Sequence, residues 1–361
     1  MNRPDDWLRP ELRGLQAYQV AEADGLIKLD AMENPFDLPA EVAGQWGEAL
    51  SGLPVNRYPD AAAREVKQAL RQAMGIPASA SLMLGNGSDE ILQILMLAVA
   101  APDACLVTPA PGFAMFGLIA RTVGLRCVSV PLADDFSLDA DAMVAAIERE
   151  QPALVIVAQP NNPTGNAFDA AALRRVVETA PGAMVIDEAY FPFADDDCLA
   201  WLDDYPQLLI MRTVSKLGLA GLRLGLLVGA PAWIEALEPL RLPYNVNTLT
   251  QAAAALALAH YPEFQAQAEA IRKERPRLAS ALAAVPGVEV LPSQANFLLM
   301  RVPPGRAPAW HAALREQGVL IKNLHGSHPR VADCLRATVG TPAENDALIR
   351  ALEVVAAADR G

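Results

Sequence analysis

The sequence has few cysteines and few histidines, and most of them are far apart. Its four cysteines include no Cys-x-x-Cys pair, which argues against a disulfide framework and favours reduced thiols in a cytoplasmic protein. Among the four histidines, His325 and His328 form an HxxH pattern, but Gly326 and Pro329 beside them favour a loop over a ligand-bearing helix. We therefore expect no bound metal.

A basic surface and a long apolar run are also missing. Lys and Arg number 29 against 42 Asp and Glu, and the net charge of −13 argues against nucleic acid as the main partner. The longest apolar runs, 91–101 and 252–259, fall short of the ~20 residues that a membrane helix needs. The first residues show no apolar core of a secretory signal. With 52% hydrophobic residues, however, the chain can bury a sizeable core.

Short apolar runs alternate with helical patterns as far as about residue 240. Strands are predicted at 82–84, 104–108, 125–130, 154–158, 183–186, 208–211 and 224–228. Strands that alternate with helices indicate βαβ units, so we expect an α/β fold with a mostly parallel sheet flanked by helices.

The pattern changes after this point. Two long helices are predicted, at 248–260 and 263–284, and two more at 307–317 and 342–357. Short strands are predicted near 288–291, 296–302, 319–322 and 335–338. We therefore expect a large α/β domain over 45–240 and a smaller α+β domain made of both chain ends, 1–44 and 241–361.

Polar segments follow four of the predicted strands: GNGSDE, QPNNPTG, DEAY and RTVSK. Ligands bind outside the carboxyl ends of the strands in an open α/β sheet, so these segments are expected to converge on one site. A shielded Lys216 would lose its proton easily and could attack a carbonyl carbon, although an exposed lysine is the alternative. Asp187 could act as a base, hold a metal or pair with a protonated ring nitrogen. No GxSxG elbow supports Ser–His–Asp chemistry.

The GNGSDE segment is predicted to be a glycine turn at the start of a helix. We expect Ser88 to be the N-cap, with the backbone N–H groups of Gly87, Ser88 and Asp89 cradling a phosphate. The segment is neither a GxGxxG fingerprint nor a Walker A loop, and Asp89 and Glu90 also suit the helix dipole. In NNPTG, the turn fixes Asn162 at a strand end with its amide able to donate; an ordinary Asx turn is the alternative.

The ordered set NNPTG, DEAY and SK followed by GLR resembles the fold-type I aminotransferases, which use pyridoxal 5′-phosphate, over residues 29–341. The resemblance implies that Lys216 bonds to the cofactor and moves the substrate's α-proton, and that Asp187 keeps the ring nitrogen protonated. It also implies hydrogen bonds from Asn162 and Tyr190 to the ring's phenolic oxygen. The other residues it implicates are Phe113 (ring stacking), Gly87, Ser88, Asp89, Ser215 and Arg223 (phosphate), and Arg336 (substrate carboxylate).

Further segments, LDAMENPF, RYPD, PYNVN, SQANFLL and LRATVGT, resemble the histidinol-phosphate aminotransferase branch of that family. The resemblance implies histidine biosynthesis, with L-histidinol phosphate and 2-oxoglutarate or glutamate as substrates. It also implies a homodimer in which Tyr58 reaches the partner's cofactor phosphate, and a Tyr18 near the substrate phosphate. Packing roles are the alternatives for both tyrosines.

Three other functions stay open from the residues. An aromatic amino acid aminotransferase and a phosphothreonine decarboxylase are similar in sequence, and Lys322 stands where relatives often have arginine. Because an ammonium replaces a planar guanidinium there, phosphate recognition is expected to be looser. A non-catalytic cofactor-binding regulator is disfavoured by the presence of Lys216 and by the charge of −13.

Overall fold

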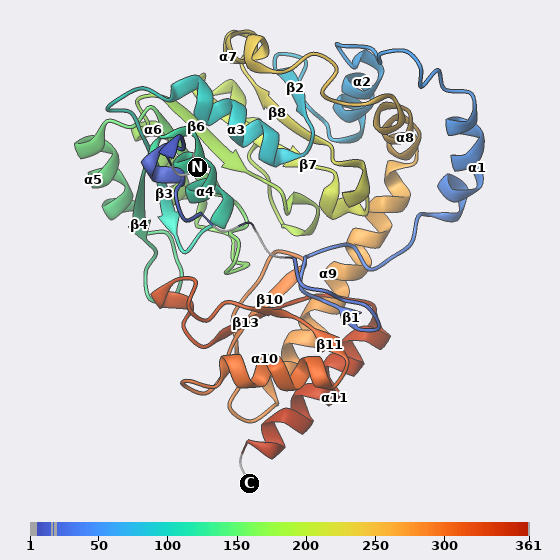
Figure 1. Ribbon diagram of the computed structural model, residues 1–361, viewed down its shortest axis with the longest axis vertical. Helices are drawn as coiled ribbons and strands as arrows, with labels where there is room; N and C mark the ends of the chain where they lie inside the picture. Colours follow the sequence, from blue (N-terminus) through green and yellow to red (C-terminus); the bar gives the residue numbers. More distant parts are fainter. Residues whose placement is uncertain (1–5, 16, 18–19, 360–361) are drawn as a thin grey trace.

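The computed structural model describes residues 6–15, 17 and 20–359, and its largest element is a seven-stranded sheet (Figure 1). The strands are β2 (Ser81–Gly85), β3 (Cys105–Ala110), β4 (Arg126–Pro131), β5 (Leu154–Ala158), β6 (Ala183–Asp187), β7 (Leu208–Thr213) and β8 (Gly225–Gly229). They lie in the order β2-β8-β7-β6-β5-β3-β4, and β8 runs antiparallel to both neighbours while the others are parallel. The seven predicted strands and the mostly parallel sheet are confirmed.

The reversed direction of β8 follows from the connection that precedes it. Between β7 and β8 the chain forms two short 3-10 turns, η5 (Ser215–Leu217) and η6 (Ala220–Leu222). A parallel return needs a crossover of about a dozen residues or more, usually a helix. Because this connection is shorter, the chain turns back beside β7, and Lys216 stays at the carboxyl edge of the sheet.

Helices cover both faces of the large sheet. They are α2 (Arg64–Ala73), α3 (Ser88–Val99), α4 (Ala114–Val123), α5 (Ala140–Glu150), α6 (Ala170–Thr179), α7 (Pro231–Leu237) and α8 (Thr248–Ala259). Successive side chains of a strand point to opposite faces. In β5, Val155 and Val157 accordingly join the core under α2, α5, α6 and α8, whereas Leu154 and Ile156 join the core under α3, α4 and α7. Burial on both faces explains why the strands are continuous apolar runs.

A smaller α+β part is drawn mostly in orange and red in Figure 1, with its strand β1 in blue. Its four-stranded antiparallel sheet has the order β12-β13-β10-β9, and β1 pairs with β11 in a separate parallel ladder. The elements are β1 (Ile27–Lys28), β9 (Glu289–Val290), β10 (Phe297–Arg301), α10 (Ala307–Glu316), β11 (Val319–Leu320), β12 (Lys322–Asn323), β13 (Cys334–Thr338) and α11 (Pro342–Ala358). The single strand predicted at 319–322 is wrong: the chain changes partner at Ile321, so its two halves belong to different sheets.

Helix α9 (Tyr261–Ala283) joins the two parts. Tyr261 and Phe264 pack into the core of the large sheet, whereas Ala268 and Ile271 pack into the core of the small one. Helix α1 (Ala40–Ser51) lies against α8, so it packs with the large part. The predicted division into two domains, with a boundary near residue 240, stays a prediction.

Within the described part of the chain, no helix is both long enough and apolar enough to cross a membrane.

Candidate active site

A cavity of about 230 Å³ opens at the carboxyl edge of the large sheet, next to the small part. The segments that follow β2, β5, β6 and β7 all reach it, together with the segment after β1. Nine of the residues singled out in the sequence line it: Ser88, Asp89, Phe113, Asn162, Asp187, Tyr190, Ser215, Lys216 and Arg223. The structure thus brings segments 135 residues apart in the sequence, from Ser88 to Arg223, to one place.

Lys216 projects into this cavity from the short turn η5. Its Nζ donates a hydrogen bond to the backbone oxygen of Ala31 at 3.3 Å and lies 5.8 Å from the centre of the Tyr190 ring. Burial, together with the positive charges of Arg336 and Arg223, lowers the pKa of Lys216 to about 8. A lysine with this pKa is uncharged in part near neutral pH, so its nitrogen can act as a nucleophile or base.

Asp187 is the last residue of β6 and is buried. Among the described residues, the backbone N–H of Ala189 is its one hydrogen-bond donor, at 3.0 Å from Oδ1. Burial raises the pKa of Asp187 to about 7, and this single hydrogen bond opposes the shift without cancelling it. A positive group in the cavity would stabilise the ionised carboxylate.

Asn162 connects the large sheet to the small one. Its Nδ2 donates to Tyr190 Oη at 3.0 Å, and its Oδ1 accepts from Arg336 Nη1 at 2.5 Å. Arg336, on β13, also donates to the backbone oxygen of Asp30 at 3.2 Å. Burial raises the pKa of Tyr190, so its phenol keeps its proton and can donate. Tyr190 Oη lies 3.3 Å from Met32 Sδ.

The turn before α3 forms a tight cradle. Helix α3 begins at Ser88 and its N-cap is Gly87, so the prediction that Ser88 is the N-cap is wrong. The reason is that residue 87 has a non-helical backbone with φ 84°, which favours glycine; a Cβ there would also lie 2.6 Å from Nη2 at the end of the Arg223 side chain. Only glycine lets the guanidinium approach this closely, and the first N–H groups of α3 have no partner within the helix.

The polar groups around the cradle come from the β7–β8 connection. Thr213 Oγ1 donates to Ser215 Oγ at 2.8 Å, and Arg223 Nη2 lies 3.7 Å from Asp89 Oδ2. N–H groups at a helix start, a hydroxyl and a guanidinium together make a binding site for a phosphate. Phe113 closes the opposite wall, held edge-to-face against Phe116 with ring centres 5.5 Å apart.

One predicted residue of the described part of the chain, Tyr58, lies elsewhere. Tyr58 does not line the cavity: its side chain is 80% exposed and stacks on Tyr244, with ring centres 4.4 Å apart. Tyr18 lies outside the described residues.

Besides four alanines, the residues that line the cavity and that sequence reasoning missed are Met32, Glu33 and Thr213. Thr213 lies within the RTVSK segment, so its hydroxyl at the end of a strand was a usable signal. Met32 and Glu33 belong to LDAMENPF, which carried a family likeness but no local sign of a site. In the described part of the chain, no three His, Cys, Asp or Glu residues are grouped to hold a metal ion.

This fold and this cavity define a pyridoxal-phosphate-dependent aminotransferase. Residues 24–352 match the family model for aminotransferase class I and II, and the chain belongs to this family. It is 50% identical to "Histidinol-phosphate aminotransferase 2" of Nitrosococcus oceani over 98% of both chains. It is also 50% identical to "Histidinol-phosphate aminotransferase" of Chromobacterium violaceum, over 96% of this chain and 97% of the other.

A solved structure agrees. Histidinol-phosphate aminotransferase of Sinorhizobium meliloti, in complex with pyridoxal 5′-phosphate, superposes with a TM-score of 0.85 at 26% identity, covering 97% of this chain and 98% of the other. The residues described above fit this cofactor. Asp187 is a buried carboxylate that lacks a cation, and the start of α3 with Arg223 suits a phosphate.

Proposed function

We propose that this protein transfers an amino group between L-histidinol phosphate and 2-oxoglutarate or glutamate, a step of histidine biosynthesis. Identity of 50% with two enzymes of that name, over nearly the whole chain, supports the substrate. The observation that carries the reaction type is the placement of Lys216, partly buried and with its pKa lowered to about 8, in one cavity with Asp187.

Each residue of the cavity has a role in this proposal. Pyridoxal 5′-phosphate, when bound, supplies a ring that accepts electrons from the bond broken at the substrate's α-carbon. Lys216 holds the cofactor covalently and then moves a proton at that carbon, for which a pKa near the working pH is suitable. Asp187 keeps the ring nitrogen protonated. Asn162 and Tyr190 orient the ring through its phenolic oxygen, with Phe113 stacked on it.

The phosphate end of the cofactor is assigned to a second group of residues. Gly87, Ser88 and Asp89 form the cradle, in which the N–H of Gly87 bonds to the backbone oxygen of Gly85 and those of Ser88 and Asp89 are offered to the phosphate. Ser215 and Arg223 add a hydroxyl and a charge-assisted contact. This anchor leaves the ring end to the residues that do the chemistry.

Recognition of the substrate's anionic end is assigned to Arg336. The two substrates differ, since one carries a phosphate and the other two carboxylates, and a guanidinium can bind either group with two parallel hydrogen bonds. Lys322 lies directly opposite Arg336 in the β12–β13 ladder. Opposed residues of an antiparallel pair project to the same face, so a second cation lies beside the first. Tyr18 is proposed for the same end of the substrate.

A second copy of the chain completes the proposed enzyme. Tyr58 and Leu242 are 80% and 71% exposed, and exposed large apolar side chains are suited to contact another protein chain. We propose that they face a partner subunit in a homodimer and that Tyr58 reaches the partner's cofactor phosphate. The cytoplasmic location also stays a prediction.

A titration of the cofactor-loaded protein tests this function. L-Histidinol phosphate, L-phenylalanine and phosphothreonine are added separately, and the cofactor's visible absorption band is followed. We expect L-histidinol phosphate to remove the band at the lowest concentration and 2-oxoglutarate to restore it. A stronger response to phenylalanine would make the protein an aromatic aminotransferase. Release of carbon dioxide from phosphothreonine without a keto acid would make it a decarboxylase.

A further inference from the structure

A chain of hydrogen bonds joins the cradle before α3 to the segment 241–247, and Glu90 is at its centre. Glu90 Oε2 accepts from the backbone N–H of Asn86 at 2.7 Å and from Asn245 Nδ2 at 2.6 Å. Asn245 Nδ2 also donates to the backbone oxygen of Leu84 at 3.0 Å. One carboxylate oxygen therefore contacts the turn that precedes the helix and a residue 155 positions away in the sequence.

The position of Glu90 in its helix is that of a capping-box glutamate, but its contact differs. In a capping box this side chain returns to the N-cap N–H. Here it binds the N–H one residue earlier, on Asn86, while the N–H of the cap Gly87 bonds to the backbone oxygen of Gly85 at 2.8 Å. The N–H groups of the helix start are thus left pointing along the helix axis, toward the position of the proposed phosphate.

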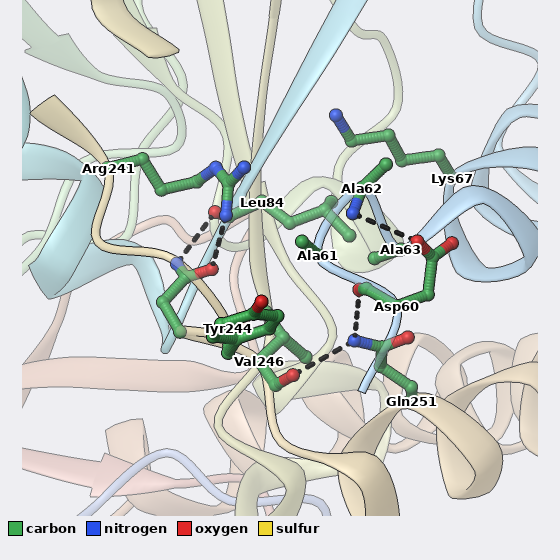
Figure 2. A pocket seen from close by; sticks show the side chains of 11 residues that line it. Asp60, Ala61, Ala62, Ala63, Lys67, Leu84, Arg241, Tyr244, Val246 and Gln251 are labelled. Carbon is green, nitrogen blue, oxygen red and sulfur yellow. Dashed lines mark hydrogen bonds between the residues drawn. The ribbon is translucent and has the colours of Figure 1, made fainter. Parts of the chain in front are cut away.

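The other end of the chain fixes the segment 241–247. Arg241 Nη1 donates to Asn245 Oδ1 at 3.0 Å, and Arg241 Nε donates to Glu238 Oε2 at 2.7 Å. In Figure 2, dashed lines that start at Arg241 and at the backbone oxygen of Leu84 mark the hydrogen bonds of these two groups with Asn245. Between these contacts lies Tyr244, with φ 61°. A tyrosine rarely adopts this left-handed backbone, so it persists because its neighbours are held on both sides.

A second set of hydrogen bonds holds the segment of Tyr58, whose ring stacks on that of Tyr244. Gln251 Nε2 donates to the backbone oxygens of Asp60 and Val246, at 3.0 and 2.9 Å, as Figure 2 shows. This joins the segment of Tyr58 to that of Tyr244, whose rings stack. The cavity among these residues is about 10 Å³, room for roughly one water molecule, so it is a packed joint and not a ligand site.

We propose that Glu90 is a positioning residue that couples the phosphate cradle to the exposed Tyr58–Tyr244 pair. Cofactor binding then favours the arrangement in which this pair is presented to a second subunit, and subunit association in turn favours cofactor binding, since such coupling is reciprocal. The cradle half of the proposal, that Glu90 positions the phosphate cradle, requires only that the cofactor binds there. The subunit half rests on the proposed function, because the homodimer is part of it.

The dissociation constant of pyridoxal 5′-phosphate tests the cradle half. Glu90→Ala removes both acceptor contacts and is expected to raise this constant about tenfold, and Glu90→Gln, which keeps an oxygen in place, to restore most of the affinity. Asn245→Ala is expected to raise it several-fold although Asn245 does not line the cavity. The double variant Glu90→Ala/Asn245→Ala should bind no more weakly than Glu90→Ala, since both remove one link.

Glu65→Ala is the matched control. Glu65 is an exposed acid in the first turn of α2 and acts on its own helix dipole alone, so the constant should stay within about twofold of wild type. An unchanged constant in Asn245→Ala, or additive effects in the double variant, would mean that Glu90 is only a helix cap and would overturn the proposal.

The subunit half is tested by the dimer dissociation constant with and without cofactor. We expect the cofactor to strengthen the wild-type dimer about tenfold and the Glu90→Ala dimer less than threefold. Equal strengthening in both would overturn the coupling. A wild-type protein that stays monomeric would instead refute the homodimer and the subunit half, while the affinity comparison would still decide the cradle half.

Discussion

Two carboxylates follow each other at the end of β6, and their hydrogen-bond partners differ. Both Asp187 and Glu188 are buried. Glu188 accepts from Arg212 Nε at 2.8 Å and from the backbone N–H of Cys198 at 2.6 Å. Asp187 faces the cavity, where Ala189 N–H is its donor among the described residues. Glu188 is compensated within the chain by a cation, and Asp187 is not.

This difference separates a carboxylate with a structural role, Glu188, from one that lines the cavity, Asp187. Burial lowers the pKa of Arg212, but Glu188 and Asp197 raise it more, as expected for a cation held in place permanently. A buried charge without a partner costs several kcal/mol, so a fold tolerates it where a ligand supplies the partner. We therefore infer that Asp187 pairs with the cationic ring of a bound cofactor and that Glu188 stabilises the fold.

Replacing Lys216, which lies in the cavity with Asp187, is expected to have the largest effect on activity. Lys216→Ala should lower kcat by about 10⁴-fold, because the same side chain holds the cofactor and moves the proton. The measurement is steady-state transamination, with circular dichroism to confirm folding. Lys273→Ala, at an exposed position on α9, is the control and should be active. A Lys216→Ala protein with a tenth of wild-type activity would contradict the assignment.

Neutralising the uncompensated carboxylate should come next. Asp187→Asn is expected to lower kcat by about 10³-fold, since an amide cannot keep the ring nitrogen protonated. It should also weaken cofactor binding, measured by equilibrium dialysis. If Asp187→Asn and Glu188→Gln lost the same activity, the two carboxylates would not differ in role.

Replacing Glu188, the carboxylate that is paired within the chain, should affect stability instead of activity. Glu188→Gln leaves Arg212 with Asp197, 2.9 Å away, as its remaining acid. The free energy of unfolding is expected to fall by about 3 kcal/mol, the usual result of removing one partner of a buried pair. Urea denaturation measures this, and cofactor affinity should change less than twofold. A stable variant with poor cofactor binding would reverse the comparison.

The smallest of these effects is expected at Arg336, which donates a hydrogen bond to Asn162 of the cavity. Arg336→Lys keeps the charge but loses the planar pair of donors, so kcat/KM for 2-oxoglutarate should fall by about 30-fold. Cofactor affinity should be unchanged, which separates substrate recognition from cofactor binding. An equal fall with Arg212→Lys would show that the effect comes from general loosening of the fold.

Local patterns were enough to predict most of the elements. Strand β5 coincides with its prediction, and all four polar segments predicted to converge do reach the cavity. Pairing between distant segments was not predictable in the same way. The split at Ile321 depends on which strands happen to lie on either side, and the reversal of β8 depends on the short connection after β7.

In the site, too, contacts between distant segments could not be predicted from local patterns. Lys216 and Asp187 could be found because each follows an apolar strand at a sheet edge. The contact between Lys216 and the backbone of Ala31 spans 185 residues and has no local signal. Gly87 and not Ser88 is the N-cap because residue 87 is the one with a non-helical backbone, φ 84°, which the residue types alone did not predict.

The pH dependence of stability without cofactor tests the central claim most directly. The pKa of Asp187 is raised from 3.8 to about 7, so the stability tied to its proton is complete below pH 4 and is lost as the pH rises through 7. Asp187→Asn should therefore be more stable than wild type by about 1.5 kcal/mol at pH 5 and about 4 kcal/mol above pH 7. A difference between the two proteins that did not change with pH would show that Asp187 is already compensated, and the distinction from Glu188 would fail.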